Sequence, residues 1–176
     1  MSLLELLLYS FSKNTNGHID VRRVFEILIP TFNNLFEDEH KREVFLTNIL
    51  NFEKFDVNYA DPIELFSCIL MAYLNAAYSG KNNFNSFADN EKFLLFCRDE
   101  LGVYKAEMSV FFQSLQLLEN LKRLESYQKR GPRRQKSFVF QENFVLSLKL
   151  GLISNFLTIK EFVFWMNERE YGIAYF

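Results

Sequence analysis

Residues 61–80, DPIELFSCILMAYLNAAYSG, have the pattern of a long apolar helix whose start and end are both marked in the sequence. Asp61 suits the N-cap, Pro62 the first helical position and Glu64 the third, where a carboxylate completes the capping pattern. The apolar run ends shortly before Gly80, and glycine favours the end of a helix. We therefore predict a helix between Asp61 and Gly80.

The same signals bracket two further apolar runs. TIKEFVFWMNEREYG, residues 158–172, has Thr158 and Glu161 at the spacing of a capping box. DNEKFLLFCRDELG, residues 89–102, starts at an aspartate and closes at a glycine. Each run is predicted to be one helix.

The remaining apolar runs also predict helices. Residues 104–130 are expected to form one helix that runs without interruption until Gly131 and Pro132 break it. Further helices are predicted at residues 1–11, 20–29 and 37–52. No run alternates apolar and polar residues between hairpin turns, which is the pattern of a strand. The predicted fold is all-α, with about eight helices.

The stretch GKNNFNSFADN, residues 80–90, is the best candidate for a boundary within the chain, because it is rich in Gly, Asn and Ser and has helices on both sides. About four predicted helices fall on each side. The prediction is two packed helical halves, residues 1–82 and 83–176.

Charge divides unevenly along the chain. Residues 1–110 carry ten basic and sixteen acidic side chains, whereas residues 111–176 carry ten basic and six acidic ones. A bipolar molecule can attract an anionic partner on one side only, and can also stack positive against negative between identical subunits. The 21 Phe and eight Tyr are a surplus of large rings. That surplus indicates either a subunit interface or a coding bias.

The segment SKNTNGHIDVRR, residues 12–23, resembles a calcium-binding EF-hand loop but lacks the ligands that neutralise the ion. Gly17 stands at the sixth position of the loop. Ser12 and Arg23 occupy the first and twelfth positions, where the ion requires an aspartate and a bidentate glutamate. We interpret the segment as a turn between helices.

No other pattern indicates catalytic, metal or cofactor chemistry. His18 and His40 are the only histidines, neither lies near a cysteine in sequence, and zinc sites use three or four ligands. The acidic run at residues 37–39 is typical of a helix N-terminus. No glycine-rich phosphate loop and no nucleophile elbow occurs among the six glycines. We predict no catalytic residues, no metal, no cofactor and no enzymatic activity.

Membrane association is not expected either. The apolar opening MSLLELLLYSF includes Glu5, has no basic region before it and is too short to span a bilayer. Cys68 and Cys97 both lie in apolar runs, where a free thiol behaves as a small buried hydrophobic group. A reducing compartment, the cytoplasm, is the simplest location for such a chain.

Residues 122–136, KRLESYQKRGPRRQK, hold seven lysines and arginines and one acidic residue, Glu125. The apolar stripe of the preceding helix runs out after Leu124, so the last helical turns are expected to project from the core. Seven positive charges so close together repel one another unless an anion is present. A helix dipole explains two or three of them, and the alternative is a solvated helix end with a flexible loop.

Nucleic acid is the partner that this segment favours. Lysine and arginine contacts to phosphate give affinity without reading sequence, and Tyr127 or Phe138 could stack on an exposed base. The flanking residues do not form the amphipathic helix that a lipid surface requires.

An all-helical chain of this size, rich in Phe and Asn, with two helical halves and the segment KRGPRRQK at residues 129–136, resembles the closterovirus RNA-silencing suppressors that assemble into rings. The resemblance covers the organisation of the whole chain. It implies a homo-oligomer in the host cytoplasm whose positive inner face binds small RNAs without sequence preference and keeps them from the silencing machinery. The residues expected to bind RNA are Lys122, Arg123, Lys129, Arg130, Arg133, Arg134 and Lys136, with Arg22 and Arg23 as further candidates.

The leading hypothesis is therefore a non-enzymatic RNA-binding homo-oligomer. The alternative is a helical adaptor that uses the basic segment to grip an acidic protein, or uses aromatic surface to capture a partner helix.

Overall fold

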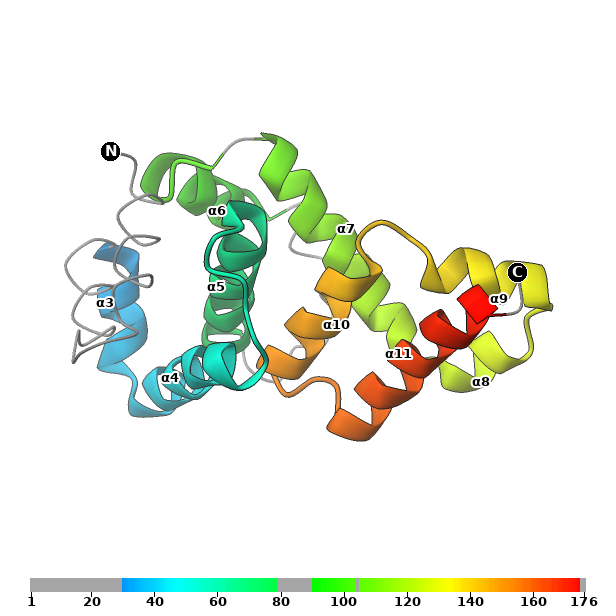
Figure 1. The fold of residues 1–176 in the computed structure, drawn as a ribbon. Coiled ribbons are helices and arrows are strands. Elements are labelled where there is room, and N and C mark those ends of the chain that lie inside the picture. The colour runs from blue at the N-terminus through cyan, green and yellow to red at the C-terminus, as the bar shows by residue number, and fades with distance from the viewer. Residues whose placement is uncertain (1–29, 79–89, 104, 175–176) are drawn as a thin grey trace.

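The structure is a computed structural model that describes residues 30–78, 90–103 and 105–174. Within these ranges every regular element is helical, which confirms the all-α prediction (Figure 1). The elements are α3 Pro30–Glu37, α4 Glu39–Lys54, α5 Pro62–Ala77, α6 Glu91–Leu95, the π-helical turn η3 Phe96–Glu100, α7 Lys105–Leu121, α8 Leu124–Gln128, α9 Pro132–Val139, α10 Phe144–Ile153 and α11 Ile159–Ala174. The predicted helices at residues 1–11 and 20–29, and all but the last residue of the predicted boundary, lie outside the described residues.

The N-cap at Asp61 and the capping box of Thr158 and Glu161 formed as the sequence predicts, whereas the Glu64 carboxylate accepts from the Asn58 N–H at 2.9 Å and does not cap α5. One side-chain oxygen of Asp61 accepts hydrogen bonds from the backbone N–H groups of Ile63 and Glu64 at 3.0 and 3.3 Å, which fixes the start of α5. At α11 the Glu161 carboxylate accepts from the Thr158 N–H at 2.7 Å, and the Thr158 hydroxyl accepts in return from the Glu161 N–H at 3.2 Å. This reciprocal pair is a capping box.

The helix that starts near residue 90 ends differently from a plain α-helix. Asn90 caps its start, since its side-chain oxygen accepts from the Phe93 N–H at 3.1 Å. After α6 the chain widens into the π-helical turn η3, and Gly102 beyond it has a φ of +66°. That left-handed conformation is one that glycine adopts without strain, so Gly102 closes the helix as predicted.

The predicted uninterrupted helix over residues 104–130 is wrong. Helix α7 ends at Leu121, the chain turns through Lys122 and Arg123, and α8 begins at Leu124. The Leu121 carbonyl, which in a continuous helix accepts from the N–H four residues later, instead accepts from Trp165 Nε1 at 3.2 Å. Pro132 also does not end the helical region, because it occupies the first turn of α9.

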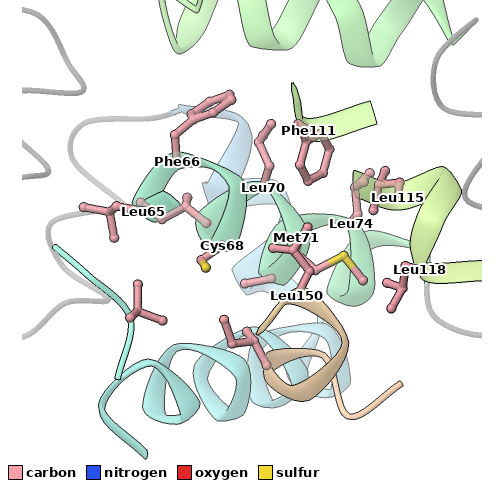
Figure 2. Packing of buried hydrophobic residues seen from close by; sticks show 14 of the residues in the cluster. Leu65, Phe66, Cys68, Leu70, Met71, Leu74, Phe111, Leu115, Leu118 and Leu150 are labelled. Carbon is pink, nitrogen blue, oxygen red and sulfur yellow. The ribbon is translucent and has the colours of Figure 1, made fainter. Parts of the chain in front are cut away.

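The buried apolar side chains of the described residues form one cluster, with α5 at its centre. Figure 2 labels side chains of this cluster from three helices, among them Leu70 of α5, Leu118 of α7 and Leu150 of α10. Gly151 of α10 leaves room for the side chain of Leu157. A Cβ added at Gly151 would lie only 2.5 Å from Leu157 Cδ1. The core therefore joins residues from both sides of the predicted boundary.

Cys68 and Cys97 are buried free cysteines, as their apolar surroundings predict. Burial raises the pKa of both thiols, that of Cys97 to about 12. Both thiols are therefore protonated near neutral pH and have the character of small apolar side chains.

Candidate nucleic-acid interface

The basic segment forms a helical corner instead of a helix end followed by a loop. Residues 122–136, from here on the basic corner, comprise the turn after α7, the short helix α8, the connection at 129–131 and the first half of α9. In Figure 1 this corner lies at the opposite end of the molecule from α3 and α4. Of its seven cations, Arg133, Arg134 and Lys136 stand on α9, whereas the other four lie in the turn before α8 and in the connection after it.

Two aromatic side chains anchor the basic corner to the core. Tyr127 of α8 and Phe138 of α9 are 3% and 5% exposed. Their ring centroids lie 4.7 and 5.5 Å from that of Trp165 on α11. The expectation that Tyr127 or Phe138 could stack on a base is therefore wrong, because both rings are already packed inside the protein. The expectation that the helix projects from the core after Leu124 is wrong for the same reason.

Polar contacts fix the same two helices. The Tyr127 hydroxyl donates to Glu168 Oε2 at 2.8 Å. Burial and this carboxylate raise the pKa of Tyr127, so the phenol is a permanent donor near neutral pH. The Gln135 amide donates to the carbonyls of Tyr127 and Gln128 at 3.3 and 3.4 Å and so caps the end of α8.

The end of α9 is capped by Arg169 of α11. The Arg169 guanidinium donates to the Val139 carbonyl and lies 5.1 Å from the centre of the Phe140 ring. A cation at a helix C-terminus also complements the helix dipole. Nothing near Arg169 in the sequence signals this role, because Val139 is 30 residues away.

Lys122 is engaged within the protein. Its ammonium group lies 3.0 Å from the Glu161 carboxylate and 5.2 Å from the centre of the Phe156 ring. Burial by itself would raise the pKa of Glu161, but hydrogen bonds from Thr158 and Lys122 outweigh burial and lower it. Lys122 therefore has an intramolecular carboxylate partner in Glu161.

Arg130 and Lys136 are half-buried. The guanidinium carbon of Arg130 lies 5.0 Å from the centre of the Phe138 ring, so this side chain contributes packing as well as charge. Arg130 and Lys136 therefore present only part of their surface to a ligand.

The four other predicted residues are exposed, and within the described part of the chain none of them forms a salt bridge. From here on they are the four unpaired cations, and they are Arg123, Lys129, Arg133 and Arg134. Two of them stand in the first turn of α9, which has no acidic residue to balance the positive end of the helix dipole. Arg133 and Arg134 are adjacent in the sequence, and Lys129 stands four residues before Arg133.

An acidic run lies far from the basic corner in the described part of the fold. Glu37, Asp38 and Glu39 are exposed at the junction of α3 and α4, at the end of the molecule remote from the basic corner (Figure 1). The side chain of Asp38 accepts from the Lys41 N–H at 3.1 Å, so this acidic run starts a helix as predicted. Among the described residues, this acidic run and the basic corner therefore lie at opposite ends of the fold.

Within the described ranges, no three His, Cys, Asp or Glu side chains are grouped as a metal site requires. No helix in those ranges has the length and apolar character needed to cross a bilayer. Arg22, Arg23 and the loop at residues 12–23 lie outside the described residues.

Comparison with known proteins identifies no family for this chain. No protein-family model, no curated protein and no solved structure matches the chain.

Proposed function

We propose that this protein binds RNA through the phosphate backbone, without sequence preference, at the basic corner. The observation that carries the proposal is the set of four unpaired cations, two on α9 and two directly flanking α8, in helices that Tyr127, Gln135 and Arg169 fix in place. Exposed cations without internal partners repel one another, and phosphates relieve that repulsion. RNA is preferred to DNA on the strength of the resemblance to closterovirus silencing suppressors. Sequestration of small RNAs in the host cytoplasm follows from the same resemblance.

Binding of this kind is driven by counterion release. Four phosphate contacts give a slope of about −3 to −4 in a plot of log affinity against log salt. This corresponds to roughly a hundredfold loss of affinity between about 50 and 200 mM salt. The slope would be steeper if all seven predicted residues contacted phosphate, but Lys122 has a carboxylate partner already.

The first test replaces three of the unpaired cations, Lys129, Arg133 and Arg134, by alanine. We expect the affinity for short RNA duplexes of unrelated sequence to fall at least about tenfold, and the salt slope to become shallower by about 3. Fluorescence anisotropy with labelled duplexes at two or more salt concentrations measures both quantities. Arg130 is left in place because its removal also disturbs packing on Phe138.

A matched control has the same change in net charge at another place. Lys54, Lys92 and Lys105 are exposed lysines outside the basic corner, and their joint replacement by alanine also removes three positive charges. The control variant should bind RNA nearly as well as the unaltered protein. Equal affinity of the two triple variants would contradict the proposal, because binding would then depend on net charge and not on the corner.

We also propose that the protein is a homo-oligomer, supported by its bipolar charge and by the same resemblance. Acidic and basic ends on one molecule allow two copies to associate with opposite charges in contact. Light scattering should give a mass in solution that is a multiple of 21.0 kDa. A strict monomer over the micromolar range, with and without RNA, would contradict this part of the proposal.

A second candidate function is an adaptor for an acidic protein partner. Ile159, Val163 and Tyr171 of α11 are 56%, 48% and 64% exposed, and α11 packs against α9 of the basic corner. An acidic amphipathic helix could place its apolar face on these side chains and its carboxylates near the corner. If the unaltered protein fails to bind any RNA duplex at low salt, this function replaces the first.

A further inference from the structure

Ser137 on α9 combines an exposed hydroxyl with two arginines at helical spacing. The local sequence RRQKSF, residues 133–138, places Arg134 three residues and Arg133 four residues before the serine. Side chains at these spacings lie on one face of a helix. Ser137 is exposed, and within the described part of the chain its hydroxyl takes part in no hydrogen bond. Neither arginine forms a salt bridge there.

An arginine three residues before a serine is the feature that basophilic serine kinases select. The pattern R-x-x-S occurs at two places in the 176 residues, Arg123 to Ser126 and Arg134 to Ser137, and both lie at the basic corner. Of the two, Ser126 directly follows an acidic residue, Glu125. Because Lys122, four residues before Ser126, is paired with Glu161, Ser137 has the stronger positive surroundings.

We propose that Ser137 is a phosphorylation site for a basophilic serine kinase, and that its phosphate weakens anion binding at the basic corner. In this reaction the Ser137 Oγ attacks the γ-phosphorus of ATP. An Oγ–P bond forms while the bond from the γ-phosphorus to the bridging oxygen breaks. The hydroxyl proton passes to a carboxylate of the kinase, and ADP leaves. The regulatory consequence rests on the proposed function, whereas the modification itself does not.

The electrostatic effect of such a phosphate is large at this place. The basic corner has a formal charge of +6 from seven cations and Glu125. A phosphoserine adds about −1.5 to −2 near neutral pH and accepts charge-assisted hydrogen bonds from arginines within reach. Arg133 and Arg134 would then be engaged within the helix. Two of the four unpaired cations would thus be withdrawn from any ligand.

Access for a kinase requires α9 to open, since kinases bind their substrates in extended form and Phe138 and Val139 are buried. The start of this helix is suited to opening. Gly131 provides no side-chain cap, and two arginines stand at the positive end of the dipole. Helices of eight residues also have little stability of their own. Phosphorylation of the folded protein is therefore expected to be slower than that of a free peptide of the same sequence.

The test starts with the intact protein, ATP and a kinase that selects arginine at the third position before serine. Mass spectrometry should locate phosphate on Ser137, and the S137A variant should lose that label. The R134A variant should lose most of it as well. A free peptide covering residues 130–141 serves as the positive control. If the peptide is phosphorylated while Ser137 of the intact protein is not, the proposal is overturned.

The second stage measures anion binding with heparin, a polyanion that is independent of RNA recognition. An S126A protein phosphorylated at Ser137 should elute from immobilised heparin at lower salt than the same protein after phosphatase treatment. For RNA, the salt slope should become shallower by about 2. Unchanged heparin elution overturns the proposed effect. If heparin elution shifts but RNA does not bind in either state, the proposed RNA function fails and this inference stands.

Discussion

Replacing Trp165 by alanine is expected to lower the free energy of unfolding by about 3 to 5 kcal/mol, the range observed for removal of a large buried aromatic side chain. Trp165 is fully buried on α11. Its ring lies 4.7 Å from Tyr127 and 5.1 Å from Phe164, measured between ring centroids. An alanine leaves a cavity at the point where α7, α8, α9 and α11 meet.

The same substitution removes a hydrogen bond that shapes the chain. Trp165 Nε1 donates to the Leu121 carbonyl at 3.2 Å, and Leu121 is the last residue of α7. Without the indole, this buried carbonyl loses its partner at the break between α7 and α8. Because Tyr127 also loses its main ring contact, α8 should loosen, and the basic corner should bind RNA more weakly although no cation has changed.

Urea unfolding followed by far-ultraviolet circular dichroism measures the free energy of unfolding. Tryptophan fluorescence is unsuitable, because Trp165 is the only tryptophan of the chain. The Trp165→Phe variant should have a free energy of unfolding between those of the unaltered protein and Trp165→Ala, because it retains an aromatic ring but not the N–H donor. Tyr171→Ala is the matched control on the same helix. Tyr171 is 64% exposed, so its removal should change stability by less than about 0.5 kcal/mol. A Trp165→Ala protein as stable as this control would contradict the description of the aromatic cluster.

The helix starts could be predicted from the sequence because their causes are local. The N–H groups that donate to Asp61 lie within three residues of it, and Thr158 and Glu161 are also three residues apart. The positive φ at Gly102 is also a local signal, because Gly102 directly follows Leu101, the C-cap of η3. Such signals depend on a few neighbouring residues, so the pattern contains all the information needed.

The break after Leu121 could not be predicted in this way, because its cause lies 44 residues away in Trp165. The apolar spacing continues as far as Leu124, and the segment contains no glycine or proline before Gly131 to mark a turn. One local signal is compatible with two structures. Gly131 followed by Pro132 predicts the end of a helix, but proline is also favoured in the first turn of one, and that is the position it occupies in α9.

The candidate site shows the same division. The sequence predicts the cluster of cations, because seven of them stand within fifteen residues. It does not predict which of them have internal partners. The contact of Lys122 with Glu161 spans 39 residues, and the contact of Arg169 with Val139 spans 30. Only the folded arrangement distinguishes the four unpaired cations from the rest.

The second large loss of stability is expected on replacing Lys149. This side chain connects α10 to the start of α5. Its ammonium group pairs with Glu64 and also donates to the Asp56 carbonyl at 3.1 Å. The side chains of Lys149 and Glu64 are only 23% and 16% exposed. Asp56 has a φ of +51°, so the ammonium group holds a carbonyl at a strained turn.

Replacing Lys149 by methionine keeps the apolar stem of the side chain and removes its charge. Glu64 would then be mostly buried, with the Asn58 N–H at 2.9 Å as its remaining described donor. Breaking a buried ion pair from one side costs about 3 to 5 kcal/mol. Because this pair is partly exposed, we expect a loss of about 2 to 3 kcal/mol in the free energy of unfolding.

A double-mutant cycle separates two contributions to the lost stability: the missing ion pair and the unpaired carboxylate of Glu64. Adding Glu64→Gln to the Lys149→Met protein removes the unpaired carboxylate, so the double variant should recover more than half of the lost stability. Arg98→Met is the control, because the Arg98 and Asp99 side chains are 69% and 56% exposed and an exposed pair contributes little. If the double variant is less stable than Lys149→Met alone, the penalty is not the isolated Glu64 charge. The stability would then come from the packing and the Asp56 contact of Lys149.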